Sequence, residues 1–356
     1  MKKLLILILF SIPTIVLAQS TYTVDNKPNA KADFDDLQTA INTVAAGSTL
    51  LVSSGSYNNV TIEKRIIIKG TGYFLTENPN THADPVSSIV SGITFKKGSE
   101  GSVISGISSN GFAFSESVSN ISFVRNYVRT IGFYNTPANR GIEVTNINIF
   151  HNYIYGERRY SSSSSSSYDY SIRVGSGSLI EGNYITSSNL VKGSYLTIRN
   201  NVLWNGLPIG IGFRSQGSDI SKSTISNNIF RLGSFFINND DWENNIKNNI
   251  FFHTSVTSPT ADDNDNKLTN TNPFIEDTDD RYSTDGRYIL SSGSQAKGAG
   301  VGGIDCGMFY EIDGKDAGYR LSGLPDIPNI YEFNVPTTGY SNSTGLQINV
   351  KVKSNN

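Results

Sequence analysis

The chain has 356 residues, a formal net charge of −2 and a charged fraction of 17%. This near-neutral balance, without a run of Lys and Arg, argues against nucleic acid as the partner. The single cysteine cannot form an internal disulfide, so we expect Cys306 to be a small core residue.

The N-terminus has the pattern of a secretory signal. Met1-Lys2-Lys3 is followed by an apolar run from residue 4 to 18, which ends on the small residue Ala18. The run is too short for a membrane span, and its flanks fit a signal peptide. We therefore expect residues 1–18 to be removed and the protein to be secreted, periplasmic or at the cell surface, with no transmembrane segment left.

A short amphipathic helix is predicted over about 34–45. Asp33 is the expected N-cap, and Gly47 follows the end of the helix. One apolar stripe runs along it at helical spacing: Leu37, Ala40, Ile41 and Val44. We expect this helix to cover the open end of the domain that follows, and strands to begin at 49–52, 60–62 and 66–68.

One phrase then recurs six times: an apolar residue, two spacers, an asparagine, one spacer and another apolar residue. The asparagines are Asn126, Asn152, Asn183, Asn201, Asn228 and Asn249. A repeat of roughly 25 residues with a constant centre is typical of stacked coils. We expect the two apolar residues to point inward, the asparagine to take a left-handed corner, and asparagines to hydrogen-bond from coil to coil. The alternative is an antiparallel sandwich with many Asn turns.

Two segments carry a family resemblance. The first reads FDDLQTAINTVAAGSTLLVSSGSYNNVTIEKRIIIKGTG and the second NTNPFIEDTDDRYSTDGRYILSSGSQAKGAGVGGIDCGMF. They resemble the opening segment and the closing coil of secreted, Bacteroidetes-type proteins of the pectate-lyase-like superfamily. The resemblance spans most of residues 34–309 and implies an all-β, right-handed parallel β-helix with a short N-terminal capping helix. It implies little about activity, because this fold hosts many functions.

The domain organisation follows from these segments. We expect the β-helix domain over 19–310, with excursions at 75–87 and 155–171, and a tail over 311–356. The second excursion holds an unbroken serine run, 161–167, which is either a solvated loop or a flap over a ligand groove. In the tail, Leu346, Ile348, Val350 and Val352 alternate with polar residues and predict a half-buried strand. The tail could pack along the coil, cap its end or meet a cell-surface partner.

Catalytic motifs of this fold are incomplete in the sequence. Asp240-Asp241 matches one polygalacturonase element, but no Gly-His-Gly is present, and Gly55-Ser-Tyr57 lacks the acid that pectin esterases have nearby. Catalytic residues therefore stay unassigned, and whether the protein is a lyase-like or hydrolase-like enzyme stays open. His151 and His253 have no metal spacing and are interpreted as isolated surface or packing residues.

The acidic segment 262–266 is the densest group of hard oxygen ligands. Asp262, Asp263 and Asp265 are the candidate calcium ligands, although the segment lacks the glycine and distal glutamate of an EF-hand. A solvated turn is the competing interpretation. No other cofactor is expected.

Register predicts one outward strip. Positions one and three after each repeated asparagine should share the outer face of one sheet, where flat rings can hold sugars and Arg can contact carboxylate or sulfate. The candidate binding residues are Tyr127, Arg129, Tyr153, Tyr155, Tyr184, Trp204 and Arg231. The alternative is ordinary sheet surface covered by loops. The sequence thus favours a secreted protein that binds, and could cleave, a long polysaccharide; the alternative is a non-enzymatic surface or adhesion protein.

Overall fold

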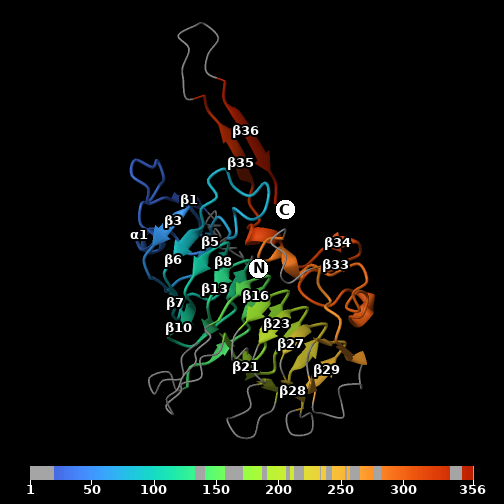
Figure 1. Cartoon of the computed structure of the whole chain (residues 1–356). Coiled ribbons are helices and arrows are strands. Elements are labelled where there is room, and N and C mark those ends of the chain that lie inside the picture. Colours follow the sequence, from blue (N-terminus) through green and yellow to red (C-terminus); the bar gives the residue numbers. More distant parts are fainter. Residues whose placement is uncertain are drawn as a thin grey trace, which may run out of the picture.

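The computed structural model describes residues 20–132, 141–156, 171–186, 191–205, 209–211, 220–232, 234–237, 243–252, 255–256, 265–275, 282–336 and 347–355. These residues wind into a right-handed parallel β-helix, as the repeat predicts (Figure 1). Several predictions fall outside them: the signal segment, the serine run, Asp240-Asp241, His253, Asp262 and Asp263.

Three stacks of parallel strands form the walls of the coil, and successive turns of the chain add parallel strands to them. Sheet A consists of β1 (Thr21–Val24), β2 (Thr49–Val52), β5 (Ile67–Lys69), β8 (Val103–Ser105), β12 (Ser122–Val124), β16 (Asn148–Phe150), β19 (Leu179–Glu181), β22 (Thr197–Arg199), β26 (Thr224–Ser226) and β29 (Asn245–Lys247). Sheet B consists of β3 (Gly55–Tyr57), β6 (Ser88–Val90), β9 (Ser108–Ser109), β13 (Tyr127–Val128), β17 (Tyr153–Ile154), β20 (Tyr184–Thr186), β23 (Val202–Asn205), β27 (Ile229–Leu232), β30 (Ile250–Phe252) and β32 (Lys267–Thr269).

The third wall is shorter. Sheet C consists of β4 (Val60–Ile62), β7 (Ile93–Phe95), β10 (Phe112–Phe114), β14 (Ile131–Gly132), β18 (Ile172–Arg173), β21 (Val191–Ser194) and β25 (Ile220–Ser221). Two further parallel groups accompany it: β11 (Val118–Ser119) with β15 (Val144–Thr145), and β24 (Ile209–Ile211), β28 (Ser234–Ile237) and β31 (Ser255–Val256). The predicted strands at 49–52 and 60–62 are confirmed, and that at 66–68 lies one residue later.

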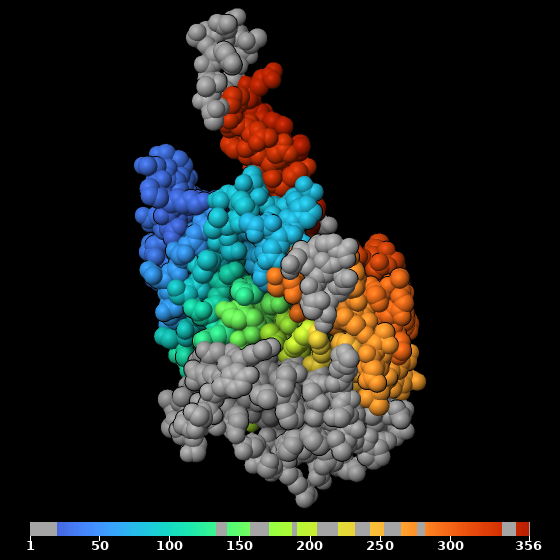
Figure 2. All heavy atoms as spheres, in the orientation of Figure 1, coloured from blue at the N-terminus to red at the C-terminus, as the bar shows by residue number. Residues whose placement is uncertain are grey.

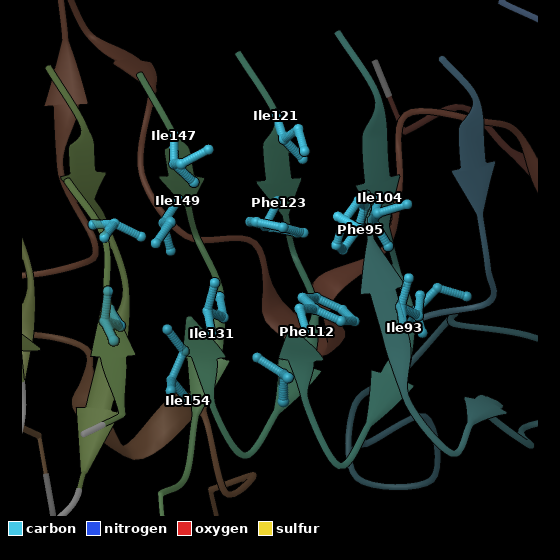
Figure 3. Packing of buried hydrophobic residues seen from close by; sticks show 14 of the residues in the cluster. Ile93, Phe95, Ile104, Phe112, Ile121, Phe123, Ile131, Ile147, Ile149 and Ile154 are labelled. Atoms are coloured by element: carbon cyan, nitrogen blue, oxygen red, sulfur yellow. The ribbon is translucent and has the colours of Figure 1, made fainter. Parts of the chain in front are cut away.

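The core of the coil is a set of columns of apolar side chains. Phe123, three residues before Asn126, and Val128, two residues after it, are both fully buried. Their equivalents on neighbouring coils pair in register, for example Phe123 with Ile149, so like side chains lie one above another (Figure 3). The inward positions predicted from the phrase are therefore confirmed.

The asparagine ladder is also confirmed, and it is longer than the phrase predicted. In each step the side-chain oxygen of one asparagine accepts from both the backbone nitrogen and Nδ2 of the asparagine before it, at 2.7–3.1 Å. Asn266 is a seventh member, because it accepts in the same way from Asn249. The ladder asparagines are buried, so their amides need these partners.

The corner geometry differs from the prediction. The left-handed conformation belongs to the residue before each ladder asparagine, with φ of +54° to +67°. The ladder asparagine has to direct its amide into the stack, and the preceding residue makes the turn. We call this set the corner column: Arg125, His151, Gly182, Asn200, Asn227, Asn248 and Asp265.

Helix α1 (Leu37–Thr43) is shorter than predicted, and its N-cap is Asp36 rather than Asp33. The Asp36 side chain accepts from the Thr39 backbone nitrogen, whereas Asp33 accepts from the backbone nitrogen and hydroxyl of Thr23. The predicted stripe is confirmed, since all four of its apolar side chains are buried. The helix packs on β4 at the first coils, where an uncovered end would expose the core.

The segment after β32 is not a closing coil, contrary to the resemblance. Residues 282–326, which we call the strap, contain three short 3₁₀ turns, η3 (Gly286–Tyr288), η4 (Val301–Gly303) and η5 (Leu321–Gly323), and a hairpin of β33 (Glu311–Ile312) and β34 (Lys315–Asp316). The strap returns along the outside of the coil toward its N-terminal end (Figure 1).

After the strap the chain forms an antiparallel ribbon of β35 (Asn329–Asn334) and β36 (Asn349–Lys353). The ribbon projects beyond the coil instead of packing on it (Figure 1). The half-buried strand predicted for the tail is therefore wrong in its burial: all residues of β36 are exposed.

Candidate functional site

The first outward row forms as register predicted. Tyr127 pairs with Tyr153, and Tyr153 pairs with Tyr184, on successive coils of sheet B. The ring centroids of Tyr153 and Tyr184 lie 4.4 Å apart in a stacked arrangement. The row continues into Val202 and Ile229, so its outer surface is apolar throughout.

The strap covers most of this row. Tyr153 and Tyr184 are only 7% and 4% exposed, and the strap residue Tyr288 stacks on Tyr184 at 4.4 Å between centroids. On the other side, Phe74 packs edge-on against Tyr153 at 5.1 Å. Burying apolar surface stabilises the folded state by about 25 cal/mol for each Å² removed from water. Covering this continuous apolar row with a segment of the same chain is therefore favourable. Tyr153 and Tyr184 thus form a second core and do not face a ligand, which corrects the prediction of an open strip.

The second outward row stays accessible. Arg129, Tyr155, Trp204 and Arg231 are all partly exposed, three residues after their ladder asparagines. Thr186 pairs with Trp204, which pairs with Arg231, so these residues occupy consecutive coils. The row lies beside the covered one, near the last residue of the sheet B strands.

Trp204 and Arg231 form a stacked pair in this row. The guanidinium carbon of Arg231 lies 3.5 Å from the centroid of the Trp204 ring, and Tyr288 meets that ring edge-on at 5.7 Å. Such cation–π contacts stabilise the pair by about 0.5–2 kcal/mol and hold the indole in one orientation. The indole is thereby fixed at the surface before any ligand arrives.

Tyr127 and Tyr155 form the other aromatic element. Their rings stack at 4.5 Å, and partial burial raises the pKa of both hydroxyl groups. Arg129 is oriented beside them, because its Nε donates to the Asn110 carbonyl at 3.3 Å. Neutral hydroxyl groups and a guanidinium next to flat rings can together hydrogen-bond and stack against a sugar.

Two buried carboxylates were missed by the sequence analysis, and both hold the strap. Glu181 is 8% exposed and accepts from Tyr310 Oη at 2.7 Å and from Arg199 at 2.9 Å. Asp285 is fully buried and accepts from Tyr319 Oη at 3.2 Å and from the Ser322 backbone nitrogen at 2.7 Å. No local pattern marks these two acids, since their partners in the strap, Tyr310, Tyr319 and Ser322, lie more than 30 residues away in the sequence.

The corner column also binds the strap, which explains its polar composition. Asn200, Asn227 and Asn248 each hydrogen-bond the strap backbone, and Arg125 pairs with Asp326 at 3.0 Å. Gly182 has no side chain, and an added Cβ there would lie 2.4 Å from Cδ2 of His151. His151 is therefore a packing residue, in agreement with its interpretation from sequence.

Asp265 is exposed and occupies the corner position before Asn266. The corner geometry therefore accounts for Asp265 without a metal. Within the described ranges, no group of three or more His, Cys, Asp or Glu side chains is arranged to hold a metal ion. The calcium proposal rests on Asp262 and Asp263, which lie outside those ranges.

Cys306 is fully buried, as predicted, and its Sγ contacts the Asn248 carbonyl oxygen at 3.2 Å. Burial raises the pKa of its thiol to about 12, so it stays protonated and unreactive at neutral pH. No helix in the described part of the chain has the length and apolar character needed to span a bilayer.

No protein-family model matches the chain, and no curated protein matches it. Among solved structures, the chain is similar to one described as the crystal structure of pectate lyase Pel9A, at 14% sequence identity and a TM-score of 0.46. The alignment covers 79% of this chain and 91% of that one.

Proposed function

We propose that this protein is a secreted, carbohydrate-directed β-helix protein that binds a long acidic polysaccharide along the accessible outer row of sheet B. The observation that carries the proposal is the fixed Trp204–Arg231 stack at the surface, with the Tyr127–Tyr155 stack farther along the same wall. The proposal keeps Arg129, Tyr155, Trp204 and Arg231 as binding residues and leaves Tyr153 and Tyr184 to the core.

The spacing of the two aromatic elements supports a linear polymer. Tyr155 lies on the coil of β17 and Trp204 on that of β23, with the coil of Thr186 between them. Two rungs of a parallel stack span about 9.6 Å, comparable to the length of a disaccharide. Thr186 is the smallest of these three side chains, so we expect it not to obstruct a sugar that contacts both rings.

The two arginines favour an acidic chain. Arg129 lies at the Tyr155 end of the row and Arg231 at the Trp204 end, both partly exposed. Guanidinium groups can bind carboxylate or sulfate in a bidentate manner, which a neutral polymer cannot match. We therefore expect uronate-containing or sulfated glycans to bind more tightly than neutral glucans, and salt to weaken the binding.

The test is retention on a panel of acidic and neutral polysaccharides by affinity electrophoresis, followed by calorimetry. Tyr155→Ala combined with Trp204→Ala is expected to weaken binding by about tenfold or more. Tyr195→Ala is the matched control, because Tyr195 is an exposed tyrosine (56%) at a corner between sheets C and A. Equal retention of the double variant and the control, with unchanged unfolding midpoints, would remove the row from consideration.

Cleavage is tested in the same panel, with and without calcium. Chain shortening with new unsaturated ends supports a lyase, whereas chain shortening without them supports a hydrolase. Retention without shortening supports a binding module.

A non-enzymatic surface protein is the second candidate. It is favoured by the ribbon β35–β36, which projects from the coil with exposed apolar side chains. Absence of binding to every glycan in the panel would favour this candidate.

A further inference from the structure

The C-terminal ribbon has one apolar face and one polar face. Ile330 pairs with Val352, and Phe333 pairs with Val350, across the two strands. Ile330 and Phe333 share a face because a bulge between Ile330 and Glu332 adds one residue to β35. Without the bulge these two side chains would point to opposite sides.

The polar face lies opposite. Glu332 faces Lys351 across the ribbon, and the two side chains form an ion pair. Asn334 faces Asn349 in the same way. The ribbon thus has the two-sided pattern of a sheet whose apolar face is packed against something.

Nothing in the described part of the chain covers that face. Six apolar side chains belong to it or continue its alternation, and each is 40–59% exposed: Ile330, Phe333, Val335, Ile348, Val350 and Val352. Figure 2 shows the ribbon standing clear of the coil. A lone two-stranded ribbon is marginal in water, so a covering layer would stabilise it.

The ribbon is nevertheless fixed at its base. Asn329 is 3% exposed and its Nδ2 donates to the Thr81 carbonyl, while Asn355 is 4% exposed and donates to the Asn329 side chain at 2.8 Å. The Ala83 nitrogen donates to the Ile330 carbonyl at 2.9 Å. These bonds fix the base of the ribbon to the segment at 75–87 and to its own second strand.

We propose that this face is a dimerisation surface, which packs against the same face of a second copy of the chain to make a four-stranded sandwich. A symmetric pair places like patches together, so both apolar faces are buried at once while both Glu332–Lys351 faces stay in water. Because the ribbon projects beyond the coil, two copies can meet through it while their coils stay apart (Figure 1).

The area of the face is sufficient for a small but specific dimer. With about 80 Å² of each of the six side chains in water, one face offers roughly 500 Å², and a pair would bury about 1,000 Å², the lower limit for a specific interface. Other exposed apolar side chains in the described part of the chain lie on separate elements of the coil and strap, such as Tyr195, Leu268 and Ile312, and Val86 is a single residue beside the base of the ribbon. The second ribbon is therefore the complementary surface.

Sedimentation velocity over a range of concentrations tests the proposal. The purified protein is expected to dimerise at micromolar concentration, and Phe333→Ser with Val350→Ser should weaken dimerisation by about tenfold or more. The matched control is Asn334→Ser with Asn349→Ser, a pair on the opposite face of the same ribbon, which should leave the dimer intact. A protein that stays monomeric at all concentrations, or that loses its dimer equally in both variants, contradicts the proposal.

A crosslink keeps the test independent of ribbon folding. The chain has a single cysteine, which is buried, so an introduced thiol is the reactive one. Val350→Cys should form a covalent dimer under mild oxidation, whereas Asn349→Cys should not. Crosslinking of neither variant, or of both to the same extent, argues against face-to-face packing. A monomer that instead binds lipid vesicles through Phe333 would also overturn the proposal.

Discussion

The side-chain oxygen of Asn201 accepts two hydrogen bonds from Asn183, one from its backbone nitrogen at 2.9 Å and one from its Nδ2 at 3.0 Å. The Nδ2 group of Asn201 in turn donates to the Ile180 and Arg199 carbonyls at 2.9 Å. One buried amide thus satisfies backbone groups on two coils and connects them.

We expect Asn201→Ala to lower the free energy of unfolding by about 3 kcal/mol or more, because several buried polar groups lose their partner together. Urea unfolding followed by circular dichroism measures the change. Asn245→Ala, an exposed strand position of sheet A, is the control and should change stability by less than about 0.5 kcal/mol. Equal effects of the two substitutions would contradict the role of the ladder.

Gly182→Ala should lower the free energy of unfolding by more than the cost of placing an alanine in a left-handed backbone conformation. Its φ is +67°, and a Cβ would also meet His151 at 2.4 Å. Gly141, with φ of +86° and no atom within 4 Å of an added Cβ, isolates the backbone cost of about 1–2 kcal/mol. In a His151→Ala background the effect of Gly182→Ala should fall to that of Gly141→Ala. If the background changes nothing, His151 does not limit that corner.

His151 should make the protein less stable in acid. Burial, followed by the positive charges of Arg125 and Arg320, lowers the pKa of His151 to about 3, and its Nδ1 is buried without a hydrogen-bond partner. In the unfolded state the His151 side chain takes up a proton near pH 6.5, whereas in the folded state it stays neutral at that pH. The contribution of the neutral His151 to the free energy of unfolding is therefore fully present above pH 6.5. It is lost as the pH falls toward 3, by about 1.4 kcal/mol for each pH unit.

The test compares His151→Asn with the wild type, because asparagine tolerates the left-handed corner. When the pH is lowered from 6.5 to 5.0, the free energy of unfolding should fall in both proteins. The fall should be about 2 kcal/mol smaller in the variant than in the wild type. Parallel pH profiles for the two proteins would show that His151 titrates normally.

Tyr310→Phe should loosen the strap. The change removes a 2.7 Å hydrogen bond to the buried Glu181 carboxylate, which contributes about 1.5–3 kcal/mol. Hydrogen exchange at the Tyr319 amide, which donates to the Met308 carbonyl, should become faster. Tyr22→Phe, in strand β1 and packed against Phe34 rather than the strap, should leave that exchange unchanged.

Interactions between residues at a fixed place in the repeat could be predicted from the sequence, whereas contacts between segments far apart in the chain could not. The repeat gave the coil and its inward columns, since a buried position such as Phe123 recurs at one place in every phrase. It also predicted which side chains share the outer rows, such as Tyr127 with Tyr153. It misassigned the left-handed corner by one residue, because Asn is common at both the corner and the ladder position.

What the sequence by itself determined is the periodic part of this protein: strand, corner and ladder repeat, and a repeated pattern can be read locally. Tertiary structure alone decided which outer surface stays open. The strap that covers Tyr153 and Tyr184 lies about 100 residues farther along the chain and has no repeat of its own. Packing between such distant segments depends on how the chain folds back in space. The spacing of residues within one repeat does not indicate which distant segment will cover it.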